Sequence, residues 1–222
     1  MLEIACFNAT SAIAAAQAGA DRIELCADYA AGGVTPSLTT LQDVRKEVTI
    51  PINVMIRPRG GNFNYSDEEF ELMKKELEML KPVASGFVFG ILDANQLVDE
   101  ARTRELVEIS APLPCTFHRA IDETGDLERA VETVAKCGFK SILTSGGEKT
   151  AQEGTGVLRY LQEVCRPKVS LIAGGGVRST NVEHLKRRTK IEWFHSAAIT
   201  MPGEDADAEE VRKIKDVLSK FN

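Results

Sequence analysis

Short apolar segments alternate with longer amphipathic segments along the whole chain. The apolar segments have the length and the β-branched content of buried strands. Eight strands are expected, at residues 2–7, 22–26, 52–57, 86–92, 113–118, 140–145, 169–175 and 192–197. Between them apolar positions recur at helical spacing, as they do in residues 66–81. Strands that alternate with helices in this way favour a parallel sheet covered by helices.

Polar residues mark where several of these helices begin and end. Ser66 followed by Glu69 predicts a capping box at the start of the helix in 66–81, and Thr180 followed by Glu183 predicts another. Gly138 is expected to end a helix over residues 126–137.

The number of strand–helix units predicts the fold class. Eight units within 222 residues fit a (β/α)8 TIM barrel, a single domain over residues 1–222. The alternative is an open, doubly wound α/β sheet. That fold carries a glycine-rich loop after its first strand, whereas this chain reads CFNATSA there. The barrel is therefore the prediction.

Composition narrows the classes of function. A net charge of -6 and a pI near 5.3 argue against nucleic-acid binding. No apolar run is long enough to cross a membrane, and the first residues lack the basic region of a secretory signal. The five cysteines are scattered and include no CxxC pair, which fits free thiols in a reducing cytoplasm and argues against a structural zinc site.

Ionisable residues gather where the expected strands end, which is where TIM barrels bind their ligands. Alternation of side chains along each strand places one set inside the barrel mouth. This set is Glu3, Glu24, Arg57 and His118, with Cys26 and Arg119 near the rim. We expect Arg57 to balance the two acids, and Arg59 with Gly60 and Gly61 to close over a ligand. The alternative is that these charges only neutralise one another, but such networks rarely stabilise more than apolar packing does.

Glycines after two later strands suggest an anion site. Gly174, Gly175 and Gly176 precede an expected helix, and N–H groups at a helix start attract anions. The LTSGG segment with Ser145 is similar. A tight turn is the alternative explanation.

The motifs RIELC, VMIRPRGG, FHRAID, LTSGG and GGGV, in this order and over nearly the whole chain, resemble those of the CutC family. The resemblance implies a TIM barrel, a cytoplasmic location, a homo-oligomer and a role in copper homeostasis with Cu(I) bound through cysteine. It also implies a set of pocket residues: Glu24, Cys26, Arg57, Arg59, His118, Arg119, Asp122 and Ser145.

The chain departs from the family pattern in two places. Relatives tend to read EVCV in the first strand, whereas this chain reads EIACF, so Cys6 is displaced by one residue and is expected to face away from the site. Relatives often read FHSSAR after the last strand, whereas Ala197 and Ile199 stand here in FHSAAIT. The second change weakens an anion clamp from that strand.

Two functions fit these residues. Cu(I) prefers soft ligands, so Cys26 is the metal-ligand candidate, with Met55 and His118 as neighbours, although the sequence does not require copper. Alternatively, an enzyme would use His118 or Glu24 as a base and hold a small anionic or phosphorylated metabolite with Arg57 and Arg119. A third alternative is a scaffold protein whose barrel mouth binds only a partner. His195 can face either side of its strand, so the sequence assigns it no role.

Overall fold

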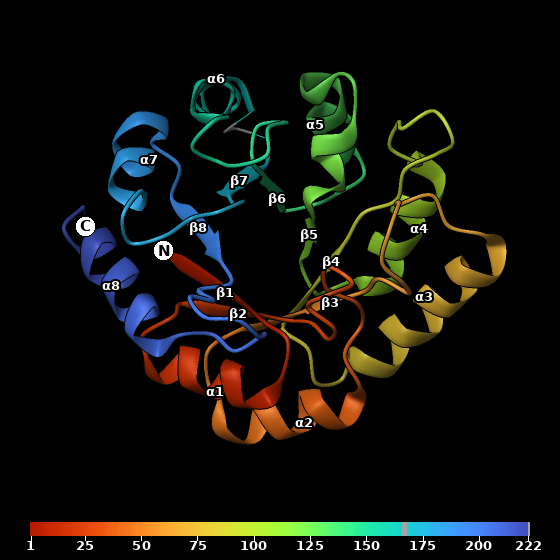
Figure 1. Cartoon of the computed structure of the whole chain (residues 1–222). Helices are drawn as coiled ribbons and strands as arrows, with labels where there is room; N and C mark the ends of the chain where they lie inside the picture. The colour runs from red at the N-terminus through yellow and green to blue at the C-terminus, as the bar shows by residue number, and fades with distance from the viewer. Residues whose placement is uncertain (166–167, 222) are drawn as a thin grey trace.

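The computed structural model describes residues 1–165 and 168–221. Eight parallel strands close into a barrel in sequence order, and β8 pairs with β1 (Figure 1). The strands are β1 (Leu2–Cys6), β2 (Arg22–Leu25), β3 (Ile52–Met55), β4 (Gly86–Phe89), β5 (Cys115–Phe117), β6 (Ser141–Thr144), β7 (Ser170–Ala173) and β8 (Trp193–Ser196). The predicted TIM barrel is confirmed, with each strand shorter than expected.

Helices surround the barrel on its outer side (Figure 1). They are α1 (Ala9–Gln17), α2 (Leu38–Glu47), α3 (Asp67–Leu80), α4 (Glu100–Ser110), α5 (Leu127–Lys136), α6 (Thr155–Cys165), α7 (Val182–Thr189) and α8 (Ala208–Ser219). A 3-10 turn, η1 (Arg119–Glu123), follows β5. Within the described residues, none of these helices combines the length and the apolar character that a membrane span needs.

The main apolar core lies between the strands and the helices. In β1 the side chains of Leu2, Ile4 and Cys6 belong to this core. Because side chains alternate along a strand, Glu3 and Ala5 face the barrel interior instead. A separate small cluster of Cys26, Met55 and Val88 lies inside the barrel. The barrel interior therefore holds buried polar side chains such as Glu3 and Glu24 together with this small apolar cluster.

The helix ends test three local predictions. The capping box of α3 is confirmed, because Ser66 Oγ accepts from Glu69 N at 3.2 Å and Glu69 Oε2 accepts from Ser66 N at 2.8 Å. The helix α5 ends at Lys136 and Gly138 adopts φ +100°, as expected. The capping box predicted from Thr180 is wrong, because α7 begins at Val182.

Candidate functional site

Three charged side chains contact one another on the neighbouring strands β2, β1 and β8. Strand register places Glu3 beside both Arg22 and His195. Glu3 Oε2 lies 2.5 Å from Arg22 Nε, and Glu3 Oε1 lies 2.8 Å from His195 Nδ1. Arg22 also stacks over the Trp193 ring, with Cζ 3.9 Å from the ring centroid. The prediction that Arg57 balances Glu3 is therefore wrong, because Arg22 and His195 already do so.

These contacts fix the protonation of the cluster. Burial alone would raise the pKa of Glu3, but the hydrogen bond from His195 and the charge of Arg22 outweigh it and hold that pKa below its usual value. An ionised Glu3 can only accept, so His195 Nδ1 carries the proton between them. His195 Nε2 is then directed toward the second acid, 3.8 Å from Glu24 Oε2.

Glu24 is the least satisfied carboxylate of this interior. Its Oε2 accepts only a weak hydrogen bond from the Cys26 thiol at 3.7 Å, and its Oε1 is buried without a partner. The pKa of Glu24 is raised to about 7, mainly by burial; the charge of His195 opposes this rise and the charge of Glu3 adds to it. Glu24 can therefore gain or lose a proton near neutral pH.

Glu3, Glu24 and His195 also form a group that could hold a metal ion, since one ligand atom from each lies within 4.8 Å of the others. Both oxygens of Glu3 are already engaged by Arg22 and His195. Only Glu24 and the Nε2 atom of His195 would therefore be available to a metal, with Glu3 orienting the imidazole from behind.

The sulfur atoms of the mouth come from β2 and β3. Cys26 packs with Met55 and Val88, and burial raises the pKa of its thiol well above its usual value, as does the nearby charge of Glu24. Cys6 packs on the outer side of β1, and Ala5 lines the mouth in its place. The prediction that Cys6 faces away is confirmed. Among the described residues, Cys26 is the one thiol that lines the cavity.

His118 is a buried, neutral hydrogen-bond donor. Burial, together with the charge of Arg57, lowers its pKa to about 3. Nδ1 accepts from the N–H of Ala120 at 3.2 Å, so the proton of the neutral ring resides on Nε2. That Nε2 atom is buried and has no partner. His118, which lines the cavity, therefore carries an N–H at Nε2 and not the lone pair that a base or a metal ligand needs at that atom.

Arg57 and Arg59 lie in very different environments although only Pro58 separates them. The guanidinium of Arg57 donates to the carbonyls of Ala31, Gly33 and Gly61, and its Nε is buried without a partner. Arg59 turns away from the cavity and pairs with Glu69 at 2.6 Å, at the start of α3.

The glycines beside these arginines pack loop against loop. A Cβ at Gly60 would lie 2.8 Å from the Ala31 carbonyl oxygen, so glycine allows the loops after β2 and β3 to meet. The sequence suggested that Arg59 would close over a ligand. In this structure Arg59 does not line the cavity.

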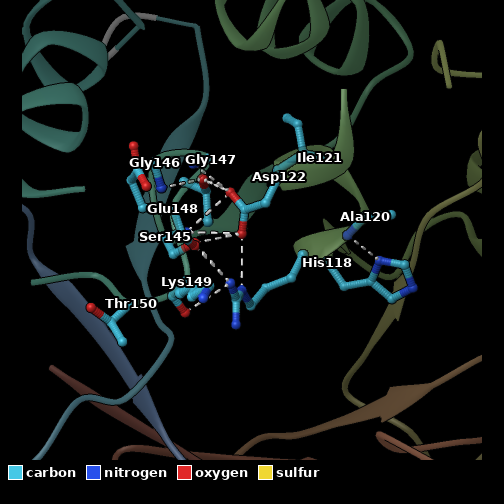
Figure 2. Close-up of polar contacts among 12 residues, drawn as sticks. His118, Ala120, Ile121, Asp122, Ser145, Gly146, Gly147, Glu148, Lys149 and Thr150 are labelled. Atoms are coloured by element: carbon cyan, nitrogen blue, oxygen red, sulfur yellow. Dashed lines mark hydrogen bonds and ion pairs between the residues drawn. The ribbon is translucent and has the colours of Figure 1, made fainter. Parts of the chain in front are cut away.

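Asp122 and Ser145 form a second polar cluster, shown in Figure 2, where β5 and β6 end. The carboxylate of Asp122 accepts from the backbone N–H groups of Ser145 and Gly147, from the hydroxyls of Thr144 and Ser145, and from Arg119 Nε. Figure 2 shows His118 turned away from this cluster and toward Ala120. Asp122 and Ser145 thus use their polar atoms to hold Arg119 rather than facing the cavity themselves.

The three glycines after β7 make room for neighbouring side chains. A Cβ at Gly174 would lie 2.5 Å from Leu143 Cδ1, and a Cβ at Gly175 would lie 3.2 Å from Arg119 Nη1. The prediction that a helix starts directly after these glycines is wrong, because α7 begins only at Val182. The N–H of Ser179 near that start is already bonded to the carboxylate of Glu210 at 2.7 Å. Gly176, which has φ +71°, belongs to the same turn.

A cavity of about 170 Å³ opens where these groups meet. Its lining includes six residues singled out in the sequence: Glu24, Cys26, Met55, Arg57, His118 and Arg119. It also includes Phe63 and His195, to which sequence reasoning gave no role. The alternation from Trp193 could have placed His195 inside, because Trp193 stacks on the inward Arg22.

Comparison with known proteins identifies the family. The family model described as the CutC family matches residues 1–200. The chain belongs to the CutC family. It is 40% identical over 199 residues to the copper homeostasis protein cutC homolog of Homo sapiens, a match that covers 89% of this chain and 73% of that protein. The homolog of Caenorhabditis elegans is also 40% identical, over 89% of this chain and 80% of the relative.

Solved structures agree with this assignment. The structure of CutC from Streptococcus agalactiae superposes with a TM-score of 0.84 at 29% identity, covering 89% of this chain and 98% of that one. Thiamine phosphate pyrophosphorylase from Pyrococcus furiosus superposes with a TM-score of 0.66 at 14% identity, over 99% of this chain and 95% of the other. The second likeness shows the barrel fold alone.

Proposed function

We propose that the chain takes part in copper homeostasis in the cytoplasm by binding Cu(I) at the barrel mouth. Relatives in the CutC family carry the name copper homeostasis protein. The observation that carries the proposal is the contact cluster of Cys26 and Met55, which brings a thiol and a thioether to the cavity. Cu(I) prefers such soft sulfur ligands.

Binding to Cys26 requires the thiol to lose its proton, because thiolate is the form that ligates metals. Glu24 Oε2, at 3.7 Å from Cys26 Sγ, is the nearest acceptor for that proton. His118 does not join the sulfur ligands in this protonation state, since its Nε2 carries a hydrogen. A homo-oligomer, which the resemblance implies, remains part of the proposal, and light scattering on the purified chain tests it.

The test is an anaerobic titration of the reduced protein with Cu(I) in competition with a chelator. We expect stoichiometric binding that weakens at least about tenfold in Cys26→Ser, because the soft anchor is lost. Cys6→Ser is the matched control, since Cys6 is also a buried β-strand thiol but lies on the opposite face of its strand. Binding that is indifferent to Cys26→Ser, or equally reduced by Cys6→Ser, would contradict direct copper binding at this site.

A second candidate function is a proton-transfer enzyme at the same mouth. It is favoured by Glu24, whose pKa of about 7 and unpartnered Oε1 suit a general base. The neutral N–H of His118 would stabilise negative charge that develops on a substrate oxygen. Arg57 and Arg119 would hold an anionic group.

The two candidates respond differently to substitution. Copper binding should fail in Cys26→Ser and persist in His118→Ala. An enzyme acting on an anion should tolerate Cys26→Ser and lose its activity in Arg57→Ala. A copper-dependent activity that both Cys26→Ser and Arg57→Ala abolish would contradict this separation.

A further inference from the structure

Arg57 is a buried cation whose hydrogen bonds go to neutral groups. Only 6% of its surface is exposed, and the bonds of its Nη atoms all end on backbone carbonyls. In the part of the chain that the structure describes, no carboxylate forms an ion pair with it. A buried charge of this kind is costly unless a counter-charge accompanies it. Among the described residues, Arg57 therefore lacks a paired counter-anion.

Two donors of the same wall also lack partners. Arg57 Nε and His118 Nε2 are both buried and unbonded, and both residues line the cavity. The Phe63 ring contacts both residues, with its centroid 4.8 Å from Arg57 Cζ and 4.8 Å from the His118 ring centroid. Arg119, in the η1 turn after β5, lines the same cavity and is held by Asp122 and Ser145. Such a convergence of donors suits an oxygen anion.

The anion is more consistent with a carboxylate than with a phosphate. Three loop N–H groups that could help to cradle a phosphate are already bonded to the protein's own acids: Asp122 accepts from Ser145 and Gly147, and Glu210 accepts from Ser179. Glu24 also lines the cavity, and its negative charge would repel a dianion.

Glu24 adds a requirement for a donor on the ligand. Its Oε1 is buried without a partner, and burying an acceptor unsatisfied costs free energy that a ligand hydroxyl would recover. The cavity of about 170 Å³ has room for a molecule equal in volume to roughly five or six waters. The remaining wall is apolar, formed by Phe7, Met55 and Leu143.

We infer that the barrel mouth binds a small hydroxycarboxylate, with its carboxylate at Arg57, His118 and Arg119 and its hydroxyl at Glu24. This names a ligand class for the proton-transfer candidate and rests on that candidate only in placing a small molecule at the mouth. It does not depend on copper. Binding without turnover would support the inference while counting against the enzyme.

The test is calorimetric titration of the reduced, metal-free chain with glycolate, acetate and inorganic phosphate slightly above neutral pH. We expect saturable glycolate binding in the millimolar range or tighter. Acetate lacks the hydroxyl and should bind about tenfold more weakly, with phosphate weaker still. Glu24→Ala should remove the preference for glycolate over acetate, because that preference comes from the hydroxyl contact.

Arg57→Met should weaken glycolate binding by about tenfold or more, whereas Arg59→Met should leave it unchanged. Because Arg57 also tethers three loop carbonyls, His118→Phe serves as a second variant that removes a cavity donor without touching those tethers. Cys6→Ser should bind glycolate like the wild type, because Cys6 packs in the core on the outer side of β1 and does not line the cavity. No saturable binding of any probe, equal affinity for glycolate and acetate, or tighter binding of phosphate would overturn the inference. So would glycolate binding that survives both Arg57→Met and His118→Phe.

Discussion

Two carboxylates at the same end of the barrel, Asp122 and Glu24, have opposite surroundings. Asp122 accepts hydrogen bonds from two backbone N–H groups, two hydroxyls and a guanidinium. Glu24 receives one weak bond from a thiol and leaves an oxygen buried and unbonded. The first arrangement fixes the structure, and the second leaves capacity for a ligand or a proton. The carboxylate with more hydrogen bonds is therefore the structural one, and Glu24 is the one with a free acceptor for chemistry.

The neighbouring residues His118 and Arg119 link these two regions. Arg119 is bonded to Asp122 and Ser145, so the satisfied cluster sets its position. His118 lines the cavity, and its Nε2 is buried without a partner. Figure 2 shows the His118 side chain directed away from the Asp122 cluster. The hydrogen bonds of Asp122 and Ser145 thus hold Arg119 in the wall of the cavity that Glu24 also lines.

The largest change in stability is expected from removing the carboxylate of Asp122, whose hydrogen bonds are described above. Asp122→Ala should lower the free energy of unfolding by about 3 to 4 kcal/mol, since several buried donors lose their acceptor at once. Urea denaturation measures this. Asp126→Ala is the control, because Asp126 only caps α5 through Arg129 N and should cost about 1 kcal/mol. Equal losses in the two variants would remove the structural distinction between the Asp122 cluster and an ordinary cap.

Replacing Glu24 should raise the free energy of unfolding, whereas replacing Asp122 should lower it. Its folded-state pKa of about 7 lies above the ordinary value of 4.5, so folding favours the protonated form. Wild-type stability therefore falls as the pH rises between these two values, and the full cost is present above about pH 7. Glu24→Gln cannot ionise, and it should be more stable than the wild type by about 2 kcal/mol above neutral pH.

The pH dependence distinguishes this explanation from simple repacking. The advantage of Glu24→Gln should shrink as the pH falls from 7 and approach zero well below 4.5, where wild-type Glu24 is protonated in both states. Glu3 acts with the opposite sign, since its pKa is lowered, but it is present in both proteins. Denaturation across this pH range measures the difference. A constant difference would show that Glu24 is not strained by its burial.

The sequence predicted which residues face the barrel interior, because alternation along a strand is a local rule. It placed Glu24, Cys26, Arg57 and His118 at the mouth, where they line one cavity. It failed on their partners, because these depend on register between strands. Arg22 pairs with Glu3 across β1 and β2, an arrangement that no single strand reveals.

The helix starts show the same division. Ser66 and Glu69 lie three residues apart, and their capping box forms as the local pattern predicts. Before α7 the pattern around Thr180 fails, because the helix begins at Val182 with Asn181 at its N-cap. The Asn181 side chain accepts from the N–H of Arg178, on the preceding turn, instead of capping the helix.

The smallest change in stability is expected from replacing Arg59. This residue tests whether many hydrogen bonds always mark a structural role, as they do for Asp122. Arg59 resembles Asp122 in being fully engaged: it pairs with Glu69 and donates to the carbonyls of Asn62 and Asn64. Its side chain is 38% exposed, so solvent screens these contacts. Arg59→Met should therefore lower the free energy of unfolding by less than about 1 kcal/mol in urea denaturation.

Arg59→Met should also leave Cu(I) affinity unchanged, because Arg59 does not line the cavity in this structure. The chelator competition that measures Cys26→Ser measures this as well, with Arg57→Met as the matched comparison. If Arg59→Met weakened the binding of either Cu(I) or glycolate, the loop after β3 would have to close over its ligand as the sequence suggested. An engaged side chain would then take part in function, and the rule that separates Asp122 from Glu24 would not hold for this barrel.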